Sequence, residues 1–274
     1  MNGPSRTALG VALHRAAHQT LDGGRIFKDP FARAILGPDA DTAIAARVTP
    51  RSRHFRQFLA VRARFAEDAL ARAVADGCEQ LLVLGAGLDT FALRNPFARL
   101  RVFEVDHPDT QDWKRRQLGL AGLNLPPCLR LVPADFEQQT LGAALDESGF
   151  DSLRPAFFIW LGVVPYLSAD AIGATLDFVT AIPRAQIVFD YPEPLENYDP
   201  RTRVQVESLR QRAAGMGEPW LSYFDPPQMA ALLRRHGFDG VEDLGPVEIG
   251  MRYLNRPDKT PRAGAHVVRA WRDA

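Results

Sequence analysis

The stretch "LLVLGAGLDTFALR", residues 81–94, decides the fold. An unbroken apolar run leads into Gly85, Ala86 and Gly87, and the pattern after Thr90 is helical, so the sequence predicts a strand, a tight turn and a helix. Glycine at 85 and 87 permits the turn and leaves room for a ligand to approach the main chain. A GxG turn is a weak indication by itself, because many such turns bind nothing.

Further apolar runs show how the sheet is built. Residues 101–105, 129–133, 156–162 and 186–191 are nearly unbroken in apolar character, which is typical of parallel strands buried on both faces. Helical patterns lie between them, with Ser168 as a candidate N-cap. This alternation predicts a doubly wound α/β fold with right-handed crossovers. The last two runs, 238–245 and 265–271, predict an antiparallel pair at the edge.

Acidic residues at the end of the second strand point to an adenosine-containing ligand. Glu104 and Asp106 lie about twenty residues beyond the glycines, where a carboxylate can accept both ribose hydroxyls. NAD and S-adenosylmethionine both fit this spacing. The pyrophosphate of NAD needs the close approach that a third glycine provides, but Thr90 stands there and the neighbouring Asp89 would repel an anion. The residues therefore favour S-adenosylmethionine, and an NAD-linked oxidoreductase is the weaker alternative.

Asp135 follows the third apolar run and has two interpretations. Its carboxylate could accept from the exocyclic amine of an adenine, with Phe136 packing beside the ring. It could equally be the N-cap of a helix that begins near Glu137.

Arg62 lies on the apolar face of a predicted helix. Residues 53–76 carry a stripe of apolar positions at helical spacing, and Arg62 falls inside it whereas Arg64 does not. A guanidinium directed at a core is costly unless it meets an anion. That anion could be a protein carboxylate, or the side chain could extend to water, or Arg62 could grip the methionine carboxylate of S-adenosylmethionine with two N–H groups.

Composition and charge exclude several classes of protein. Thirty-three basic and thirty-three acidic residues balance, so we expect no nucleic-acid partner. No apolar run reaches the length of a signal peptide or membrane span, which predicts a cytoplasmic protein without a membrane partner. Two isolated cysteines give no metal motif. His14 and His18 have the spacing of a zinc pair but lack its glutamate, so we expect an exposed helix face and no metal.

Five segments together resemble a known family. They are "LLVLGAGLDTFALR", "VFEVDHPDTQDWK", "PADFEQQ", "FIWLGVVPYLS" and "GEPWLSYFDP". The chain resembles the leucine carboxyl methyltransferase family, and within it bacterial S-adenosylmethionine-dependent O-methyltransferases, some placed near polyketide biosynthesis. The resemblance runs from "IFKDPFA" near Asp29 to about Gly237. It implies a class I methyltransferase fold, a Rossmann-like seven-stranded, mostly parallel sheet with an antiparallel edge strand.

On this basis residues 1–274 form a single methyltransferase domain. We expect a helical N-terminal extension over 1–78, a cofactor-binding core over 79–191, a lid inserted between strands five and six over 192–236, and closing strands over 237–274.

The resemblance also implies cofactor contacts. Arg62 resembles the arginine that holds the cofactor carboxylate, Asp106 the ribose acid, and Asp135 with Phe136 the adenine contacts. Leu161 departs from the pattern, because the family often has glutamate there, although its main chain could still contribute. The full set is Arg62, Gly85, Ala86, Gly87, Asp106, Asp135, Phe136, Leu161 and, if a gap is allowed in the alignment, Arg15.

The acceptor is less defined than the cofactor. A carboxylate, with a pKa of roughly 4, needs no general base, whereas a hydroxyl usually does, and no residue of the sequence stands out as catalytic. Trp220 and Tyr223 in the lid, with Tyr166 and Tyr191 at strand ends, could line the acceptor site or simply pack the lid onto the sheet. We predict methyl transfer to a carboxylate or hydroxyl oxygen of a small molecule; a non-catalytic S-adenosylmethionine-binding module is the alternative.

Overall fold

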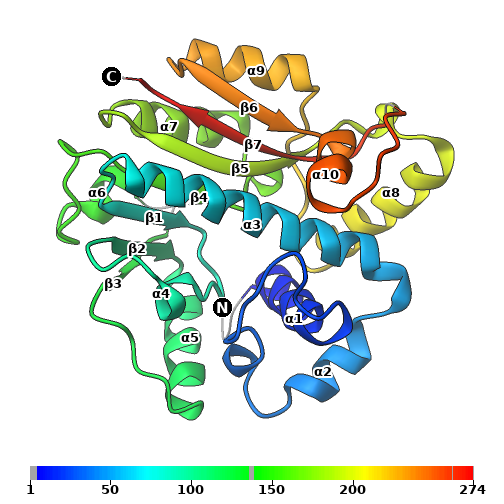
Figure 1. Cartoon of the computed structure of the whole chain (residues 1–274), viewed down its shortest axis with the longest axis horizontal. Helices are drawn as coiled ribbons and strands as arrows, with labels where there is room; N and C mark the ends of the chain where they lie inside the picture. The colour runs from blue at the N-terminus through cyan, green and yellow to red at the C-terminus, as the bar shows by residue number, and fades with distance from the viewer. Residues whose placement is uncertain (1–4, 136–138, 261, 274) are drawn as a thin grey trace.

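A seven-stranded sheet forms the centre of the molecule (Figure 1). The computed structural model describes residues 5–135, 139–260 and 262–273. The strands are β1 Gln80–Leu84, β2 Arg101–Asp106, β3 Leu129–Pro133, β4 Phe157–Trp160, β5 Gln186–Pro192, β6 Gly240–Leu244 and β7 Ala265–Trp271. Each coincides with an apolar run identified in the sequence, so the prediction of a seven-stranded α/β sheet is confirmed.

The strand order places β1 at the point where the chain reverses direction across the sheet. The order is β3-β2-β1-β4-β5-β7-β6, with parallel pairing from β3 to β5. β7 is antiparallel to both β5 and β6 and lies between them, so β6 is the outer strand. In open α/β sheets, ligands bind at the carboxyl ends of the strands beside such a reversal, which here is the β1–β4 junction.

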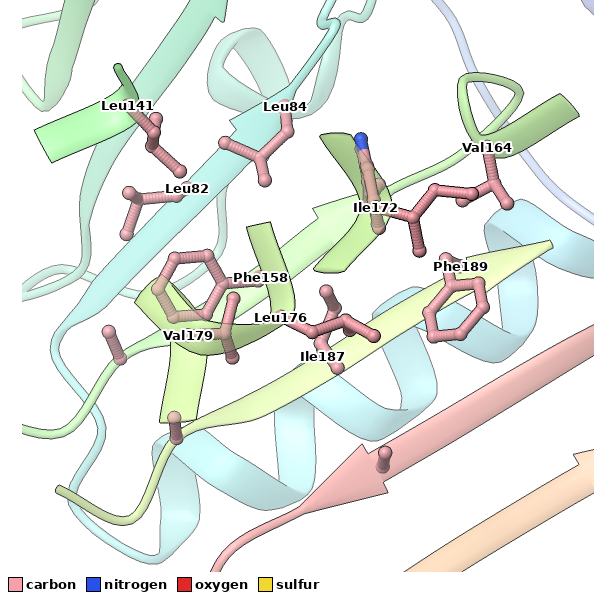
Figure 2. Packing of buried hydrophobic residues seen from close by; sticks show 14 of the residues in the cluster. Leu82, Leu84, Leu141, Phe158, Val164, Ile172, Leu176, Val179, Ile187 and Phe189 are labelled. Atoms are coloured by element: carbon pink, nitrogen blue, oxygen red, sulfur yellow. The ribbon is translucent and has the colours of Figure 1, made fainter. Parts of the chain in front are cut away.

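Alternate residues of each strand fill two cores. On one face, Leu82, Leu84 and Phe158 pack against α7 (Ala169–Thr180), as Figure 2 shows, and also against α6 (Leu141–Leu145) and α9 (Pro226–Arg235). On the other face, Leu81 and Val83 pack against α3 (Arg53–Ala75) and α10 (Pro246–Tyr253). Ser168 caps α7 as predicted, because its side chain accepts a hydrogen bond from Ala171 N.

The N-terminal extension is helical in parts. It contains α1 (Arg6–Leu21), the 3-10 turn η1 (Ala34–Leu36), α2 (Ala40–Arg47) and the 3-10 turn η2 (Pro50–Ser52) before α3 begins. Figure 1 shows α1 beside the first half of α3, and α2 packs against α1. Short helices also follow β1 and β2, namely α4 (Phe91–Arg94) and α5 (Pro108–Leu120). No helix in the described residues has both the length and the apolar character to cross a membrane.

The expected lid has two different parts. Residues 193–225 contain the 3-10 turn η4 (Leu195–Asn197) and α8 (Pro200–Gly215), whose surface is largely exposed. The next helix, α9, belongs to the sheet, because Met229 and Leu233 are fully buried in the core. Within the predicted lid range 192–236, α9 thus packs onto the sheet, whereas residues 193–225 lie outside that layer.

Candidate active site

The glycine turn is enclosed on two sides. Gly85 and Gly87 have φ of 63° and 53°, a left-handed conformation that disfavours other residues. A Cβ on Gly85 would lie 2.5 Å from Val163 Cγ2, and a Cβ on Gly87 would lie 3.2 Å from the Cβ of Ala8 in α1. The turn is thus held between the chain that leaves β4 and the first helix of the extension.

Asp106 lies directly beside this turn. Its Oδ2 accepts a hydrogen bond from Gly87 N at 2.5 Å, and its Oδ1 accepts one from His107 N at 2.7 Å. Burial raises the pKa of Asp106, while these two N–H groups favour its charged form. Glu104, two residues earlier, is fully buried in an ion pair with Lys114. Of the two acids expected at the strand end, only Asp106 borders the glycine turn.

Arg62 is buried and bonded to a protein carboxylate. Its Nη1 donates to Asp190 Oδ2 at 2.7 Å, and Asp190 Oδ1 accepts from Gly162 N at 2.6 Å. Gly162 has φ of 73°, and a Cβ there would lie 2.9 Å from Arg62 Nη2, so its missing side chain leaves space for the guanidinium. The salt bridge predicted as one alternative is present. It uses one of five N–H donors, which leaves a second role open.

A second buried acid joins α1 to the turn. Arg15 contacts the Leu88 carbonyl and lies with its Nε 2.8 Å from Asp29 Oδ2. The same Asp29 oxygen accepts from the Thr90 hydroxyl at 2.7 Å. Arg15 therefore lies at the glycine turn, and its contact with the cofactor carboxylate stays a prediction of the resemblance. Sequence reasoning assigned no role to Asp29, Asp190 or Gly162, because each acts through a contact with a distant segment.

The adenine contacts can be placed only in part. Asp135 follows β3 and is half-buried, and Phe136 lies outside the described residues. The helix start near Glu137 that Asp135 could cap lies outside the described residues, so that alternative stays a prediction; the later helix α6 is capped by Thr140, which accepts from Ala143 N. Leu161 is half-buried directly after β4 and packs against the core on the α3 face.

Three of the four aromatic residues expected near the acceptor lie close together. Tyr166 ends the 3-10 turn η3 (Val164–Tyr166). Burial raises the pKa of its hydroxyl, and the contact with the Trp220 indole partly offsets this. The Trp220 and Tyr223 rings lie 6.4 Å apart, and the Tyr223 hydroxyl donates to Trp220 O at 3.2 Å. These contacts join residues 193–225 to the end of β4.

Tyr191 lies elsewhere. It is 1% exposed, its hydroxyl donates to Asp243, and its ring stacks on His266 at 5.0 Å. This position in the core leaves no surface for an acceptor, so the predicted lining role does not extend to Tyr191. When both faces of a sheet are buried, the sequence does not show on which face the last residue of a strand lies.

The histidines provide no obvious base at this edge. His107 caps α5 by accepting from Asp109 N at 3.2 Å. The expectation that His14 and His18 occupy an exposed face is wrong, because His18 is 1% exposed and bonded to Asp22, and His14 is half-buried against Phe55. Within residues 5–135, 139–260 and 262–273, no group of three or more potential ligands could hold a metal.

Two surface pockets lie away from this edge. One, of about 610 Å³, is lined by His18, Arg53 and Tyr253, among others. The other, of about 540 Å³, is lined by Glu193, Lys259 and His266, among others. None of the residues that line them belongs to the predicted site. The candidate site is therefore described from the residues around the glycine turn and not from these pockets.

Comparison with known proteins identifies the family. Residues 8–180 match the model of a family described as "Leucine carboxyl methyltransferase". The chain belongs to this family. A relative from Bacillus subtilis, named "Putative S-adenosyl-L-methionine-dependent methyltransferase YktD", is 31% identical over 94% of each chain. A relative of the same description from Mycolicibacterium paratuberculosis is 31% identical over 92% of this chain and 87% of its own.

A solved structure supports the fold. A protein described as a putative methyltransferase from Thermobifida fusca aligns with a TM-score of 0.59, covering 100% of this chain and 97% of its own at 18% identity. The resemblance found in the sequence is thus confirmed for the family, and the cofactor favoured by the glycine turn is the one in the relatives' names.

Proposed function

We propose that this chain transfers a methyl group from S-adenosylmethionine to an oxygen atom of a small-molecule acceptor. The observation that carries the proposal is the buried Arg62, held by Asp190 at the same sheet edge as the glycine turn. The family is one of methyltransferases, and relatives that match most of the chain carry this cofactor in their names.

The residues present fit such a cofactor. Arg62 is buried yet has N–H groups beyond the one bonded to Asp190, and the absence of a side chain at Gly162 leaves room around it. These groups would hold the methionine carboxylate, assisted by Arg15. The cofactor, when bound, supplies an electrophilic methyl group on a sulfonium.

The ribose and adenine would lie on the other side of the turn. Asp106 accepts two backbone N–H bonds and interacts with the Thr110 hydroxyl, and a carboxylate has about four acceptor positions, so a ribose hydroxyl could still donate to it. Asp135 would accept from the adenine amine. The backbone of Gly85, Ala86 and Gly87 would border the ligand, with Val163 and Ala8 packed where side chains at 85 and 87 would lie.

Residues 193–225 would cover the acceptor. Methyl transfer is an in-line displacement, so the protein's contribution is alignment of two substrates and exclusion of water. Trp220 and Tyr223, packed toward Tyr166, supply an apolar surface suited to both tasks.

Product analysis tests the proposal. The protein is incubated with S-adenosylmethionine and a panel of small carboxylic acids, phenols and alcohols, and S-adenosylhomocysteine and methylated products are measured by mass spectrometry. We expect S-adenosylhomocysteine and a methyl ester or ether in equal amounts. Tight binding of the cofactor without product across the panel would favour a non-catalytic binding module, which the loss of the family's glutamate at Leu161 would then explain.

A further inference from the structure

The segment 218–222 is fixed against the end of β4 by backbone hydrogen bonds. Leu221 N donates to Pro165 O at 2.6 Å, and Ser222 N donates to the same oxygen at 3.2 Å. The Ser222 hydroxyl donates to Leu167 O at 2.6 Å. Glu218 N donates to Ala213 O at 3.0 Å and so ties the segment to the end of α8. These bonds set Glu218 and Trp220 beside η3.

One polar atom of this segment is buried without a partner. Glu218 Oε2, an acceptor, has no hydrogen bond to any residue in the described part of the chain. Trp220 Nε1 makes no hydrogen bond of good geometry there, but it lies close enough to the Tyr166 hydroxyl to lower the pKa of that group as a donor. Leaving a buried polar group unpaired costs roughly 1–3 kcal/mol, so native proteins usually satisfy such groups with a ligand or water. An acceptor without a partner indicates a ligand that can donate.

Tyr166 brings these two residues to the cofactor edge. Burial raises the pKa of Tyr166 and the Glu218 carboxylate adds to the effect, while Trp220, Thr7 and Arg62 act in the opposite direction, so the phenol stays neutral and can donate a hydrogen bond. The chain that leaves β4 connects the two places, because Gly162 lies against the Arg62 guanidinium and Pro165, next to Tyr166, accepts from Leu221 N and Ser222 N.

We propose that Tyr166, Glu218 and Trp220 bind a hydroxyl group of the acceptor, and that Glu218 is the general base that takes its proton. The acceptor is then an alcohol or a phenol. This inference rests on the proposed function and names the substrate class of the same site. A hydroxyl can donate to Glu218 Oε2, the acceptor that has no partner among the described residues. A carboxylate offers only acceptors and would face the negative charge of Glu218.

The chemistry balances without a further reactant. A lone pair of the acceptor oxygen forms the new C–O bond while the bond from the methyl carbon to sulfur breaks, and the electron pair of that bond stays on sulfur and neutralises its charge. The hydroxyl proton passes to the Glu218 carboxylate and from there to solvent. The products are a methyl ether, S-adenosylhomocysteine and one proton.

Matched acceptors and matched variants test the inference. The acceptors are phenol with benzoate and 2-naphthol with 2-naphthoate, which differ in the group that receives the methyl. The variants are Glu218→Gln and, as control, Glu196→Gln, an exposed glutamate in the same 193–225 segment. Trp220→Phe serves as a second test that removes the N–H but keeps an aromatic ring. Thermal unfolding confirms that each variant is folded, and calorimetry with S-adenosylhomocysteine reports the cofactor site independently.

The expected result is selectivity that depends on Glu218. Wild type should methylate the hydroxyl member of each pair at least about tenfold faster, and Glu218→Gln should lower kcat for it by about 100-fold or more, the usual contribution of a general base. In the same variant, the fall of kcat/KM toward low pH should disappear. Trp220→Phe should raise KM, and Glu196→Gln should match wild type. The affinity of every variant for S-adenosylhomocysteine should stay within about twofold of the wild-type value, because no contact with the methionine carboxylate changes.

Several outcomes would overturn the inference. They are faster reaction of the carboxylates, no reaction of either member of the pairs, or a Glu218→Gln enzyme whose kcat and pH profile equal those of wild type. Failure of wild type to bind S-adenosylhomocysteine would instead refute the proposed function, so the two failures are distinguishable.

Discussion

At the scale of residues, one carboxylate organises the proposed cofactor site. Asp190 accepts from Arg62 and from Gly162 N, and thereby joins α3 to the ends of β4 and β5. The guanidinium is oriented by the protein itself, and a site ordered before binding loses less entropy when the ligand arrives. In the proposed function Arg62 holds both Asp190 and the cofactor carboxylate, and a substitution must separate the two roles.

Arg62→Ala should weaken S-adenosylhomocysteine binding by about 100-fold, as expected for loss of charge-assisted hydrogen bonds in a buried site. It should also destabilise the fold by about 3–5 kcal/mol, because Asp190 stays buried without its partner. Arg64→Ala is the control, since its ion pair with Asp68 is on the surface and is worth at most about 1 kcal/mol.

The double substitution Arg62→Met with Asp190→Asn separates the two roles. Without the unpaired charge, the free energy of unfolding should return toward that of wild type, while calorimetry should still find weak binding. If the double variant binds S-adenosylhomocysteine as tightly as wild type, Arg62 is a structural salt bridge only.

Gly85 gives a prediction about stability. Gly85→Ala places a Cβ 2.5 Å from Val163 at a positive φ, so crowding of about 1–3 kcal/mol adds to backbone strain of about 1–2 kcal/mol. Gly77→Ala has φ of 92° and open space around the new Cβ, so it reports the backbone strain alone. Urea unfolding should show a clearly larger loss at 85 than at 77; equal losses would mean that Val163 moves away freely.

At the scale of elements, α1 is part of the site rather than an appendage. It contacts the glycine turn through Ala8 and Arg15, and its buried residues pack toward α3. Asp29, in the loop after α1, completes the connection through Thr90. Loss of α1 would therefore uncover the turn as well as the Arg62 helix.

The packing of α1 makes stability depend on pH. Burial, together with the neighbouring Arg56, lowers the pKa of His14 from 6.5 to about 4. Between these values the unfolded chain binds a proton that the folded chain does not, so stability falls as pH drops from about 6.5 toward 4, by at most about 3 kcal/mol.

His14→Gln isolates this effect. Urea unfolding at pH 7 and pH 4.5 should show a smaller loss for the variant than for wild type, because glutamine does not titrate. The carboxyl groups titrate in both proteins, so their contribution to the pH dependence of stability is the same in each and drops out of the comparison. Identical losses in the two proteins would show that His14 is not desolvated in the folded state.

At the scale of the whole molecule, the sheet was predictable and its tertiary contacts were not. All seven strands lie at stretches that the sequence marks as strands. β1, β4 and β5 are apolar almost throughout because they are buried on both faces, whereas β6 is half-exposed and was found from its position near the end of the chain. Asp106 was found because its distance from the glycines is set by one strand and one connection. Asp190 lies 128 positions from Arg62, and no periodicity links residues so far apart.

The same reason explains the residues whose surroundings were misjudged. Tyr191 was expected to line the acceptor site and His18 to lie on an exposed helix face, and tertiary packing buried both. Glu218 stands in a segment that looked like part of a lid, and its unpaired oxygen became apparent only when the segment was seen against Pro165 and Tyr166.

Calorimetric titration of the purified protein with S-adenosylhomocysteine and, separately, with NAD tests the central claim most directly. S-adenosylhomocysteine should bind one molecule per chain with a Kd in the micromolar range or below, and NAD should give no binding heat, because Thr90 and Asp89 oppose a pyrophosphate at the turn. Binding of NAD with no binding of S-adenosylhomocysteine would contradict the account.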